Sequence, residues 1–511
     1  MNTLWYNCDL KQTYYKLYKS SLIPPPTKRY KLSQDDFTTG TYRIIQPGYY
    51  QLTEDIVFHP NPDNQFNPTK EQFRTEVYSK MHYRLGFFAA ITVETNNVII
   101  DLNDFSISQS PEHYIHQRFY AHIEFASSPF IPNTGPANFG SSIKIPSNVI
   151  LKNGTLGLTS HHGCHGNHMS TVLIYNVTFK DFEVAAISFN AGIHIYLKNL
   201  SVLGTMREVS SLGMMSQFIF DLPFLHGIQQ KYPEATLSTK YETITIDTIV
   251  KSIETELQSF RNDPSTYTGI LKNTTGLPDS NAYGIVFNSK GPVVGPLKSM
   301  RDEYTIGNQY IYIDNVNIHN IESDSIEING YGPINGKQEA YGKDQYVGPI
   351  GDVIPLESVL DENGYYIGNL LTHMQLIINK YGIDKSEKGT CNVPLRFIHD
   401  LENYQKPIQE LMEIHQIYCI KGKDTMGHHM KGNIGLFISQ GNYVMIKNCT
   451  IDGVINHGTN PEKESSESSG ILLTGTNHLV IYNQTIRNIY SQTGKHEAIR
   501  RKHENNNVII K

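Results

Sequence analysis

The residues best suited to chemistry are three histidines in one short segment, SHHGCHGNH, which spans residues 160–168. His161, His162 and His165 could act as general acids or bases, because an imidazole exchanges its proton near neutral pH. They could also bind a divalent metal. However, two glycines indicate a strand and a turn instead of the helix face that a zinc pair would share. Three interpretations stay open: a polar turn that faces a substrate, a structural hydrogen-bonding turn, and a metal site.

Acidic residues near comparable turns are the second candidates. Glu183 follows Asp181 at one turn, and Asp324 and Glu327 follow Glu322 at another. Two carboxylates about 5–9.5 Å apart can hydrolyse a glycosidic bond, and acids within one turn could reach that separation. We therefore consider Glu183, Asp324 and Glu327 as catalytic candidates. The alternative is that they are solvated turn acids, as most acidic side chains are.

Basic and imidazole side chains in longer connecting segments are candidates for ligand binding. Arg118 and His122 lie in a segment that we expect to wall a groove. The forked guanidinium of Arg118 could hold a sugar carboxylate through two hydrogen bonds. His428 and His429 precede another strand and could overhang the same face.

A repeated segment must position these side chains. SNVILKNGTL, STVLIYNVTF and GIHIYLKNLSV carry Asn153, Asn176 and Asn199 at intervals of 23 residues. The alternation in each copy predicts a strand, and the asparagine marks a turn. A period of this length is typical of one coil of a solenoid. Related segments surround four further asparagines: Asn103, Asn315, Asn448 and Asn483.

The recurring asparagines are predicted to form a ladder. Coils of a solenoid lie about 4.8 Å apart, so equal positions form columns. An amide in such a column can accept a hydrogen bond from one coil and donate one to the next. Several of these asparagines also match the N-glycosylation pattern. Because the match recurs with the coil, we predict a structural ladder and not a set of glycan sites.

A second set of strands ends at Asn167, Asn190 and Asn288, and alternation assigns its side chains to two faces. The inward residues are Cys164, Ile187, Ile285, Ile326 and Leu436. The outward residues are His165, Ser188, Val286, Glu327, Phe437 and Leu472. The same count aligns Asp324 with His162 and Glu327 with His165. Their separation of about 14 Å, three strand spacings, is too long for a hydrolytic pair.

Residues 85–511 resemble the right-handed parallel β-helix of the pectin-lyase-like superfamily, through these coils and the opening segment NNVIIDLND. The resemblance implies a saccharide groove whose floor is the outward face of one sheet. It carries over no catalytic residue. The Trp-Ile-Asp-His block of pectate lyases is absent, since the only tryptophan is Trp5. The Asn-Thr-Asp, paired Asp-Asp and Arg-Ile-Lys motifs of polygalacturonases are absent from the coils as well.

We predict an all-β fold, a right-handed parallel β-helix solenoid with an N-terminal cap and α-helical insertions. Residues 1–36 are assigned to an arm or linker, and residues 37–84 to a β cap over the open end of the core. The solenoid follows in residues 85–511. Insertions are expected at about 108–147, 205–280 and 331–431.

Composition restricts the partners and the compartment of this 511-residue chain. A net charge of −6 gives no electrostatic case for nucleic acid. No apolar run is long enough to span a membrane, and the first residues show no secretory signal. Five cysteines, an odd and sparse set, argue for free thiols in a reducing compartment. We therefore expect an intracellular or virion protein.

Three functions are compatible with these observations. The first is carbohydrate processing or binding in a groove like that of a polysaccharide lyase or glycoside hydrolase, with a polysaccharide or glycan as partner. The second is a non-catalytic structural or adhesive solenoid, such as a virion or surface component. The third is a metal-dependent sugar isomerase or epimerase, which needs a divalent cation. The sequence leaves open whether the protein is an enzyme, and it leaves open the substrate, the cofactor and the oligomeric state.

Overall fold

The structure is a computed structural model that describes most of the chain from residue 28 onward. The described ranges are 28–64, 66, 68–75, 77–78, 82–83, 86–110, 113–114, 117, 120–129, 143–182, 184–204, 283–289, 307–323, 432–456, 467–492 and 494–511, with short pieces within 229–255 and 345–355. Their regular structure is almost entirely β-strand.

Two large sheets contain nearly all of these strands, and every pairing within them is parallel. The main path of the first sheet is β1 (Arg29–Leu32), β3 (Gly48–Leu52), β6 (Val98–Asp101), β9 (Ser147–Leu156), β11 (Ser170–Lys180), β13 (Ile193–Leu203), β17 (Gln309–Ser323), β21 (Asn442–Lys447), β24 (Asn477–Tyr482) and β27 (Asn506–Ile510). Beside that path lie β4 (Ile56–Phe58), β7 (Ser106–Gln109), β22 (Thr450–Asn456) and β25 (Thr485–Ser491).

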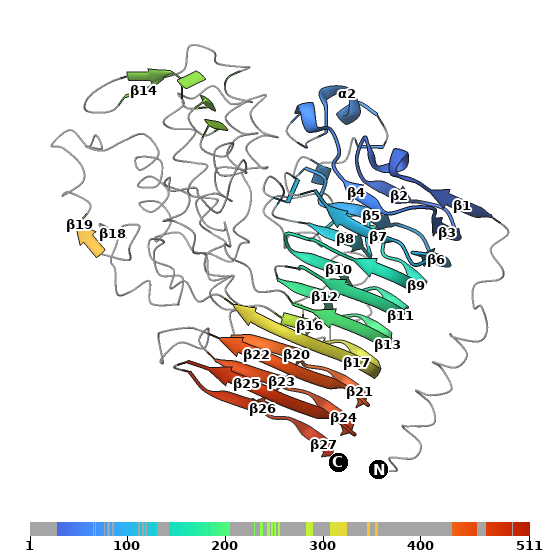
Figure 1. Cartoon of the computed structure of the whole chain (residues 1–511), viewed down its shortest axis with the longest axis vertical. Coiled ribbons are helices and arrows are strands. Elements are labelled where there is room, and N and C mark those ends of the chain that lie inside the picture. Colours follow the sequence, from blue (N-terminus) through green and yellow to red (C-terminus); the bar gives the residue numbers. More distant parts are fainter. Residues whose placement is uncertain are drawn as a thin grey trace.

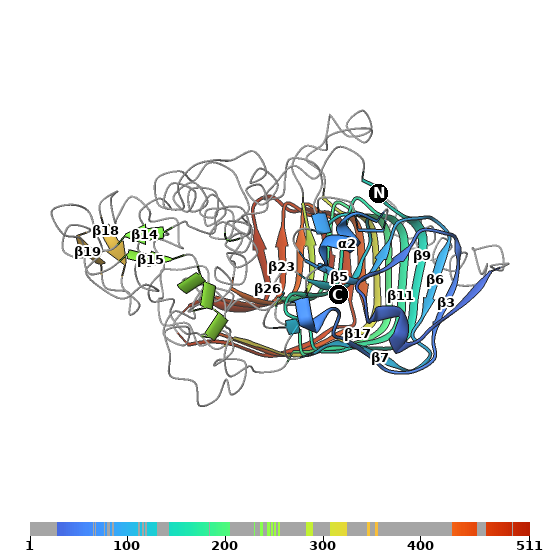
Figure 2. The ribbon, with the colours of Figure 1, turned by 90° about the horizontal axis from the view of Figure 1, so that it is seen from above.

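The second sheet, which we call the site sheet, has nine strands. It runs β2 (Tyr42–Ile44), β5 (Ala89–Val93), β8 (Ala121–Glu124), β10 (His162–Asn167), β12 (Ala185–Asn190), β16 (Tyr283–Asn288), β20 (Asn433–Ser439), β23 (Ser468–Thr474) and β26 (His496–Lys502). The chain alternates between the two sheets as it advances, so the fold is a parallel β solenoid. Figure 1 shows the strands stacked as rungs from blue to red, and Figure 2 shows the coils from above.

Other elements are short. They are η1 (Gln34–Phe37), η2 (Pro62–Asn64), α2 (Lys70–Phe73) and two antiparallel pairs, β14 (Thr236–Ser238) with β15 (Thr243–Thr245) and β18 (Gln345–Val347) with β19 (Val353–Pro355). In the part of the chain that the structure describes, no helix has the length and apolar character to cross a membrane.

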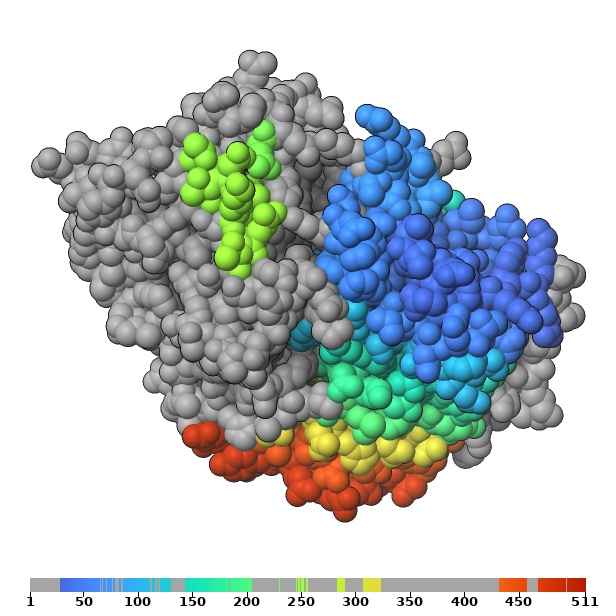
Figure 3. Space-filling view, turned by 45° about the horizontal axis from the view of Figure 1, so that its top comes forward, coloured from blue at the N-terminus to red at the C-terminus, as the bar shows by residue number. Residues whose placement is uncertain are grey.

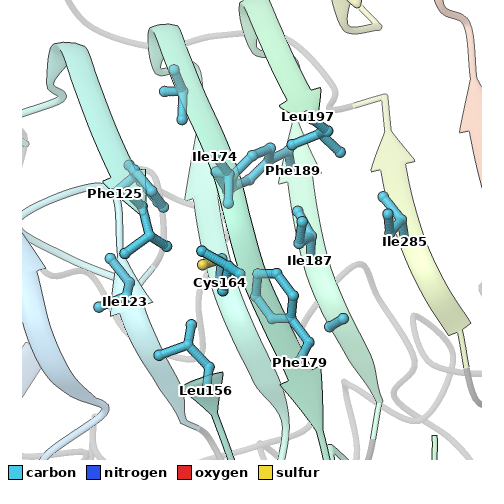
Figure 4. Packing of buried hydrophobic residues seen from close by; sticks show 14 of the residues in the cluster. Ile123, Phe125, Leu156, Cys164, Ile174, Phe179, Ile187, Phe189, Leu197 and Ile285 are labelled. Atoms are coloured by element: carbon cyan, nitrogen blue, oxygen red, sulfur yellow. The ribbon is translucent and has the colours of Figure 1, made fainter. Parts of the chain in front are cut away.

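The core lies between the sheets and confirms the predicted inward face. Cys164, Ile187, Ile285 and Leu436 are register partners on successive strands, and each is at most 2% exposed. Figure 4 shows several of these side chains pointing into the interior together with Phe179 and others from the first sheet. Ile326, which we also expected inside, lies outside the described residues.

The asparagine ladder is confirmed. Asn176 donates from Nδ2 to Oδ1 of Asn153 at 3.4 Å, and Asn199 donates to Asn176 at 3.1 Å. Asn315 donates to Asn199 at 2.9 Å, although 116 residues separate them in the chain. All four have φ between 52° and 56°, a left-handed conformation that asparagine tolerates better than most residues. The ladder thus supplies partners at a corner that the strands leave unsatisfied.

The solenoid extends further toward the N-terminus than expected. β1 begins within the segment assigned to an arm, and β2 and β3 of the expected cap pair in register with β5 and β6. The expected loop at 108–147 contributes β8, which pairs with β5 and β10. All four residues of β8 are buried, which explains why AHIE forms a rung.

The coloured coils in Figure 3 form one continuous body. The expected helices of the other two insertions lie almost wholly outside the described residues.

Candidate functional site

The outward face of the site sheet aligns one column of side chains across nine strands. The column contains Arg43, Thr92, Glu124, His165, Ser188, Val286, Phe437, Leu472 and Arg500. The predicted order from His165 to Leu472 is confirmed, with one exception. Val286 on β16 pairs directly with Phe437 on β20, so the prediction that Glu327 lies between them is wrong.

The error has a structural cause. We assumed that the chain returns to the site sheet soon after Asn315, as it does after Asn153 and Asn176. Instead β17 runs for 15 residues, and its second half pairs with β22. The alignments of Asp324 with His162 and of Glu327 with His165 therefore fail. Both acids lie outside the described residues.

The column is polar from Arg43 to Ser188 and apolar from Val286 to Leu472, and it ends with the charged Arg500. Val286, Phe437 and Leu472 are 4%, 4% and 1% exposed, and they pack with Ala185 and Ile434. These apolar side chains are covered, so this half of the column is not the open groove floor that the resemblance implied. Any site on this face is confined to the coils of β8, β10 and β12.

Glu124 and His165 form the closest ionisable contact on these coils. Oε2 of Glu124 lies 2.7 Å from Nδ1 of His165, and the two side chains are 2% and 13% exposed. They are register partners on β8 and β10, so the backbone ladder fixes their proximity. A carboxylate in this position orients the imidazole and selects its tautomer, as in other carboxylate–histidine pairs.

Asn190 on β12 holds the opposite nitrogen of the same ring. Its Nδ2 donates to Oδ1 of Asn167 at 3.0 Å and lies 3.2 Å from Nε2 of His165. Because the ladder bond orients the amide, the second N–H of Asn190 points at Nε2, which must accept. This arrangement favours the tautomer of His165 in which Nδ1 donates to Glu124 and Nε2 accepts from Asn190.

His161 and His162 complete what we call the imidazole cluster, made of His161, His162 and His165. The ring centroids of His161 and His162 are 4.1 Å apart, and the rings of His162 and His165 stack at 5.3 Å. All three side chains keep part of their surface exposed. Burial and the two adjacent imidazoles hold the pKa of His162 well below its usual range, so it is neutral near pH 7.

Glu124 is a buried carboxylate with one oxygen unused. Its Oε1 atom is buried and has no hydrogen-bond partner in the described part of the chain. Burial raises the pKa of Glu124, and the contact with His165 offsets part of that rise. One coil away, Glu94 is held by Nε and Nη2 of Arg43 at 2.7 and 2.8 Å and by Thr92. Glu94 therefore forms a structural ion pair with Arg43, while Glu124 contacts the imidazole cluster through His165.

Sequence reasoning missed Glu124 and Asn190 as site residues. Asn190 was predicted only as the end of a strand, which is also correct. Glu124 was missed because its segment was assigned to a loop. The alternation in AHIEF, with Ile123 inward and Glu124 outward, was the available signal.

The structure places the remaining candidates as follows. His122 was expected to wall a groove, but it is fully buried beneath the coil surface, and this expectation is wrong. Its Nδ1 lies 3.2 Å from the Tyr120 hydroxyl and its Nε2 lies 3.2 Å from the carbonyl oxygen of Gly157. Burial lowers the pKa of His122 to about 4. The other candidates lie outside the described residues: Arg118, Glu183, Asp324, Glu327, His428 and His429.

A metal site was the third interpretation of the histidine segment. Among the residues that the structure describes, no group of three or more His, Cys, Asp or Glu side chains is arranged to hold a metal ion. Cys164 lies beside the cluster in sequence but points into the core, where burial raises the pKa of its thiol well above the usual value.

Comparison with protein-family models and with curated proteins finds no match for this chain. The function therefore has to be argued from the geometry of the solenoid and of the imidazole cluster.

Proposed function

We propose that this protein binds and processes a polysaccharide at the imidazole cluster. The observation that supports this most strongly is the 2.7 Å contact between buried Glu124 and His165, with neutral, part-exposed His162 stacked on His165. A neutral imidazole that solvent can reach is a proton acceptor at pH 7, and its neighbours hold it in one orientation. The proposal includes a right-handed coil and kinship with pectin-lyase-like proteins.

Proton abstraction fits this site better than hydrolysis. Glycoside hydrolysis uses two carboxylates that flank one bond. On the described coils around the cluster, Glu124 is buried behind His165, and Glu94 is committed to Arg43. The cluster instead supplies imidazoles, which suit β-elimination from an acidic sugar unit.

The elimination balances without a further reagent. His162 takes the proton from the carbon next to the sugar carboxylate, a carbon–carbon double bond forms, and the glycosidic bond to the departing oxygen breaks. That oxygen takes up a proton from solvent and His162 later returns its own proton to solvent, so the products are one unsaturated and one ordinary chain end. Glu124 and Asn190 act as positioning residues, because they fix the ring of His165 against which His162 stacks. Glu183 stays a prediction for catalysis, and Arg118, His428 and His429 stay predictions for the binding of the sugar.

The test is incubation with polygalacturonate, alginate, hyaluronan and neutral polysaccharides. Reducing ends report any cleavage, and absorbance of the unsaturated product reports elimination. We expect His162→Gln to lower the rate by about a hundredfold or more, the usual contribution of a general base. Ser188→Ala is the matched control, since it alters the next residue of the same column and leaves all three imidazoles in place. Silence of the unaltered protein on every polymer would exclude the catalytic form.

A structural or adhesive solenoid is the second candidate function. The observation that favours it is the buried apolar half of the column, from Val286 to Leu472, where an extended groove would need an open polar floor. Recovery of the protein as an abundant particle component, with wild-type assembly of His162→Gln, would support this role. An intracellular or virion location is compatible with both candidates and stays a prediction.

A further inference from the structure

A second corner of the coil carries a column of unusual residues. At this corner of the first sheet the chain has φ between 52° and 60° on every successive coil. The outer positions of the column are asparagines, which suit that conformation. Its middle positions hold a threonine, two histidines and two tyrosines. In order the column is Asn97, Asn148, Thr171, His194, Tyr310, Tyr443, His478 and Asn507.

The four aromatic members, which we call the aromatic column, stack on one another. The centroid of His194 lies 4.8 Å from that of Tyr310, and Tyr310 lies 5.1 Å from Tyr443 with an interplanar angle of 4°. Tyr443 lies 4.7 Å from His478 at 8°. All four side chains are half-buried. Because the ring faces cover each other, the surface that they expose is a ridge of ring edges.

Stability alone does not account for these residues. Bulky side chains are outliers at positive φ, and such outliers persist where the surrounding structure holds them, often at binding sites. The same chain uses asparagine at both ends of this column and throughout the ladder at the next corner. Within this column the departure covers five consecutive coils, from Thr171 to His478, and its four aromatic members form one continuous surface.

The spacing and charge of the ridge restrict what it can bind. Rungs lie about 4.8 Å apart, so a ligand that contacts several rings must itself repeat along the solenoid axis. Two charged pairs lie further along the same strands, with Lys447 3.0 Å from Asp314 and Lys152 3.1 Å from Asp101. No charged side chain belongs to the column itself. The ligand should thus be a repeating polymer without charge that can meet phenol and imidazole groups.

We propose that the aromatic column binds a neutral stretch of linear polysaccharide along the solenoid axis. Tyr310, Tyr443 and His194 make the contact. His478 ends the ridge, since its Nδ1 and Nε2 already face the side chains of Asn442 and Asn507 at 3.1 and 3.4 Å. The choice of a saccharide rests on the proposed function. The surface itself is separate from the imidazole cluster, because it lies on the other sheet.

The test compares two double variants with the unaltered full chain. Tyr310→Asn with Tyr443→Asn restores the residue that this backbone prefers, and Tyr310→Phe with Tyr443→Phe keeps the stack but removes the hydroxyls. The probes are cellohexaose, xylohexaose, mannohexaose and chitohexaose, measured by calorimetry, with the unfolding temperature read in parallel. We expect at least one probe to bind. Its affinity should fall tenfold or more in the asparagine variant and measurably in the phenylalanine variant, without a lower unfolding temperature. Tyr175→Asn, a half-buried tyrosine of the same sheet outside the column, is the control and should bind normally.

Several results would overturn the proposal. One is that the unaltered chain binds no probe, and another is that all variants bind equally. A third is that the asparagine variant loses binding only because it unfolds, while the phenylalanine variant binds fully. Failure of the two sites is distinguishable, because His162→Gln should abolish elimination from acidic polymers and leave hexasaccharide binding intact. A silent imidazole cluster with a working aromatic column would refute only the enzymatic proposal.

Discussion

Two corners of the same coil have the same backbone conformation but are built from different side chains. The ladder of Asn153, Asn176, Asn199 and Asn315 has φ of 52–56°, and the aromatic column has φ of 53–58°. The first corner fills nearly every position with the residue that this backbone favours. The second departs from it on five consecutive coils, four of which carry the stacked rings. Because the geometry is shared, the backbone conformation alone does not explain the difference in side chains.

Approximate energies support that distinction. A left-handed conformation costs an ordinary L-residue about 1–2 kcal/mol, so four aromatic residues cost about 4–8 kcal/mol. Three stacked pairs return only about 1.5–4.5 kcal/mol at about 0.5–1.5 kcal/mol each. In the ladder the same corner costs less, and each amide also adds a hydrogen bond of about 1 kcal/mol. The ladder is therefore a stabilising device, whereas the aromatic column has to offset its backbone strain by stacking and by burial of its rings.

The largest effect should come from breaking the ladder. Asn176→Val places a β-branched residue at φ 54° and removes one bond to Asn153 and one from Asn199. We expect a loss of up to about 4 kcal/mol, from two hydrogen bonds and the backbone strain together. Denaturant unfolding followed by circular dichroism measures it. A loss below about 1 kcal/mol would show that the ladder does not stabilise this corner. The ladder could then no longer serve as the stabilising corner with which the aromatic column is compared.

Acid should destabilise the solenoid through a buried histidine and not through the aromatic column. The pKa of His122 is about 4 in the folded chain, below its ordinary value of 6.5, so the unfolded chain takes up the proton first. Stability that is complete above pH 6.5 is thus lost as the pH falls from 6.5 to 4. At 1.36 kcal/mol per pKa unit, the loss is about 3 kcal/mol.

His122→Gln should remove the part of the pH dependence that comes from His122, because glutamine can still donate to the Gly157 carbonyl oxygen and accept from the Tyr120 hydroxyl. His162, whose pKa is also held below its usual range, keeps its own part. His194→Asn is the control from the aromatic column. Unfolding temperatures at pH 4.5 and 7.5 give the comparison. If His194→Asn flattened the pH dependence and His122→Gln did not, the aromatic column would be the acid-sensitive element.

Repetition explains how much of this could be predicted from the sequence. A period of 23 residues aligned Asn153 with Asn176 and His165 with Ser188, because equal positions in a solenoid become neighbours. The prediction failed where the period failed. β17 continues for 15 residues, so the placement of Glu327 was wrong.

The aromatic column could have been aligned in the same way, because His194, Tyr310 and Tyr443 each lie five residues before a ladder asparagine. Their left-handed backbone angle and the stacking of their rings were not visible in the sequence, and Glu124 could not be aligned at all. Glu124 lies in a coil whose connecting segments obscure the period. In both cases contact across coils, which only the fold provides, reveals the group.

The smallest effect, a gain, tests the comparison most directly. Thr171 occupies the aromatic column's corner at φ 56°, next to Asn148, which donates to Oδ1 of Asn97 at 3.1 Å. Thr171→Asn should extend that short amide ladder by one rung and relieve a β-branched residue at positive φ, for a gain of about 1 kcal/mol. Thr178→Asn, a substitution within β11 away from any corner, is the control and should be neutral or destabilising. A destabilised Thr171→Asn would mean that this corner selects against asparagine for structural reasons. The aromatic residues beyond it would then need no ligand to explain them.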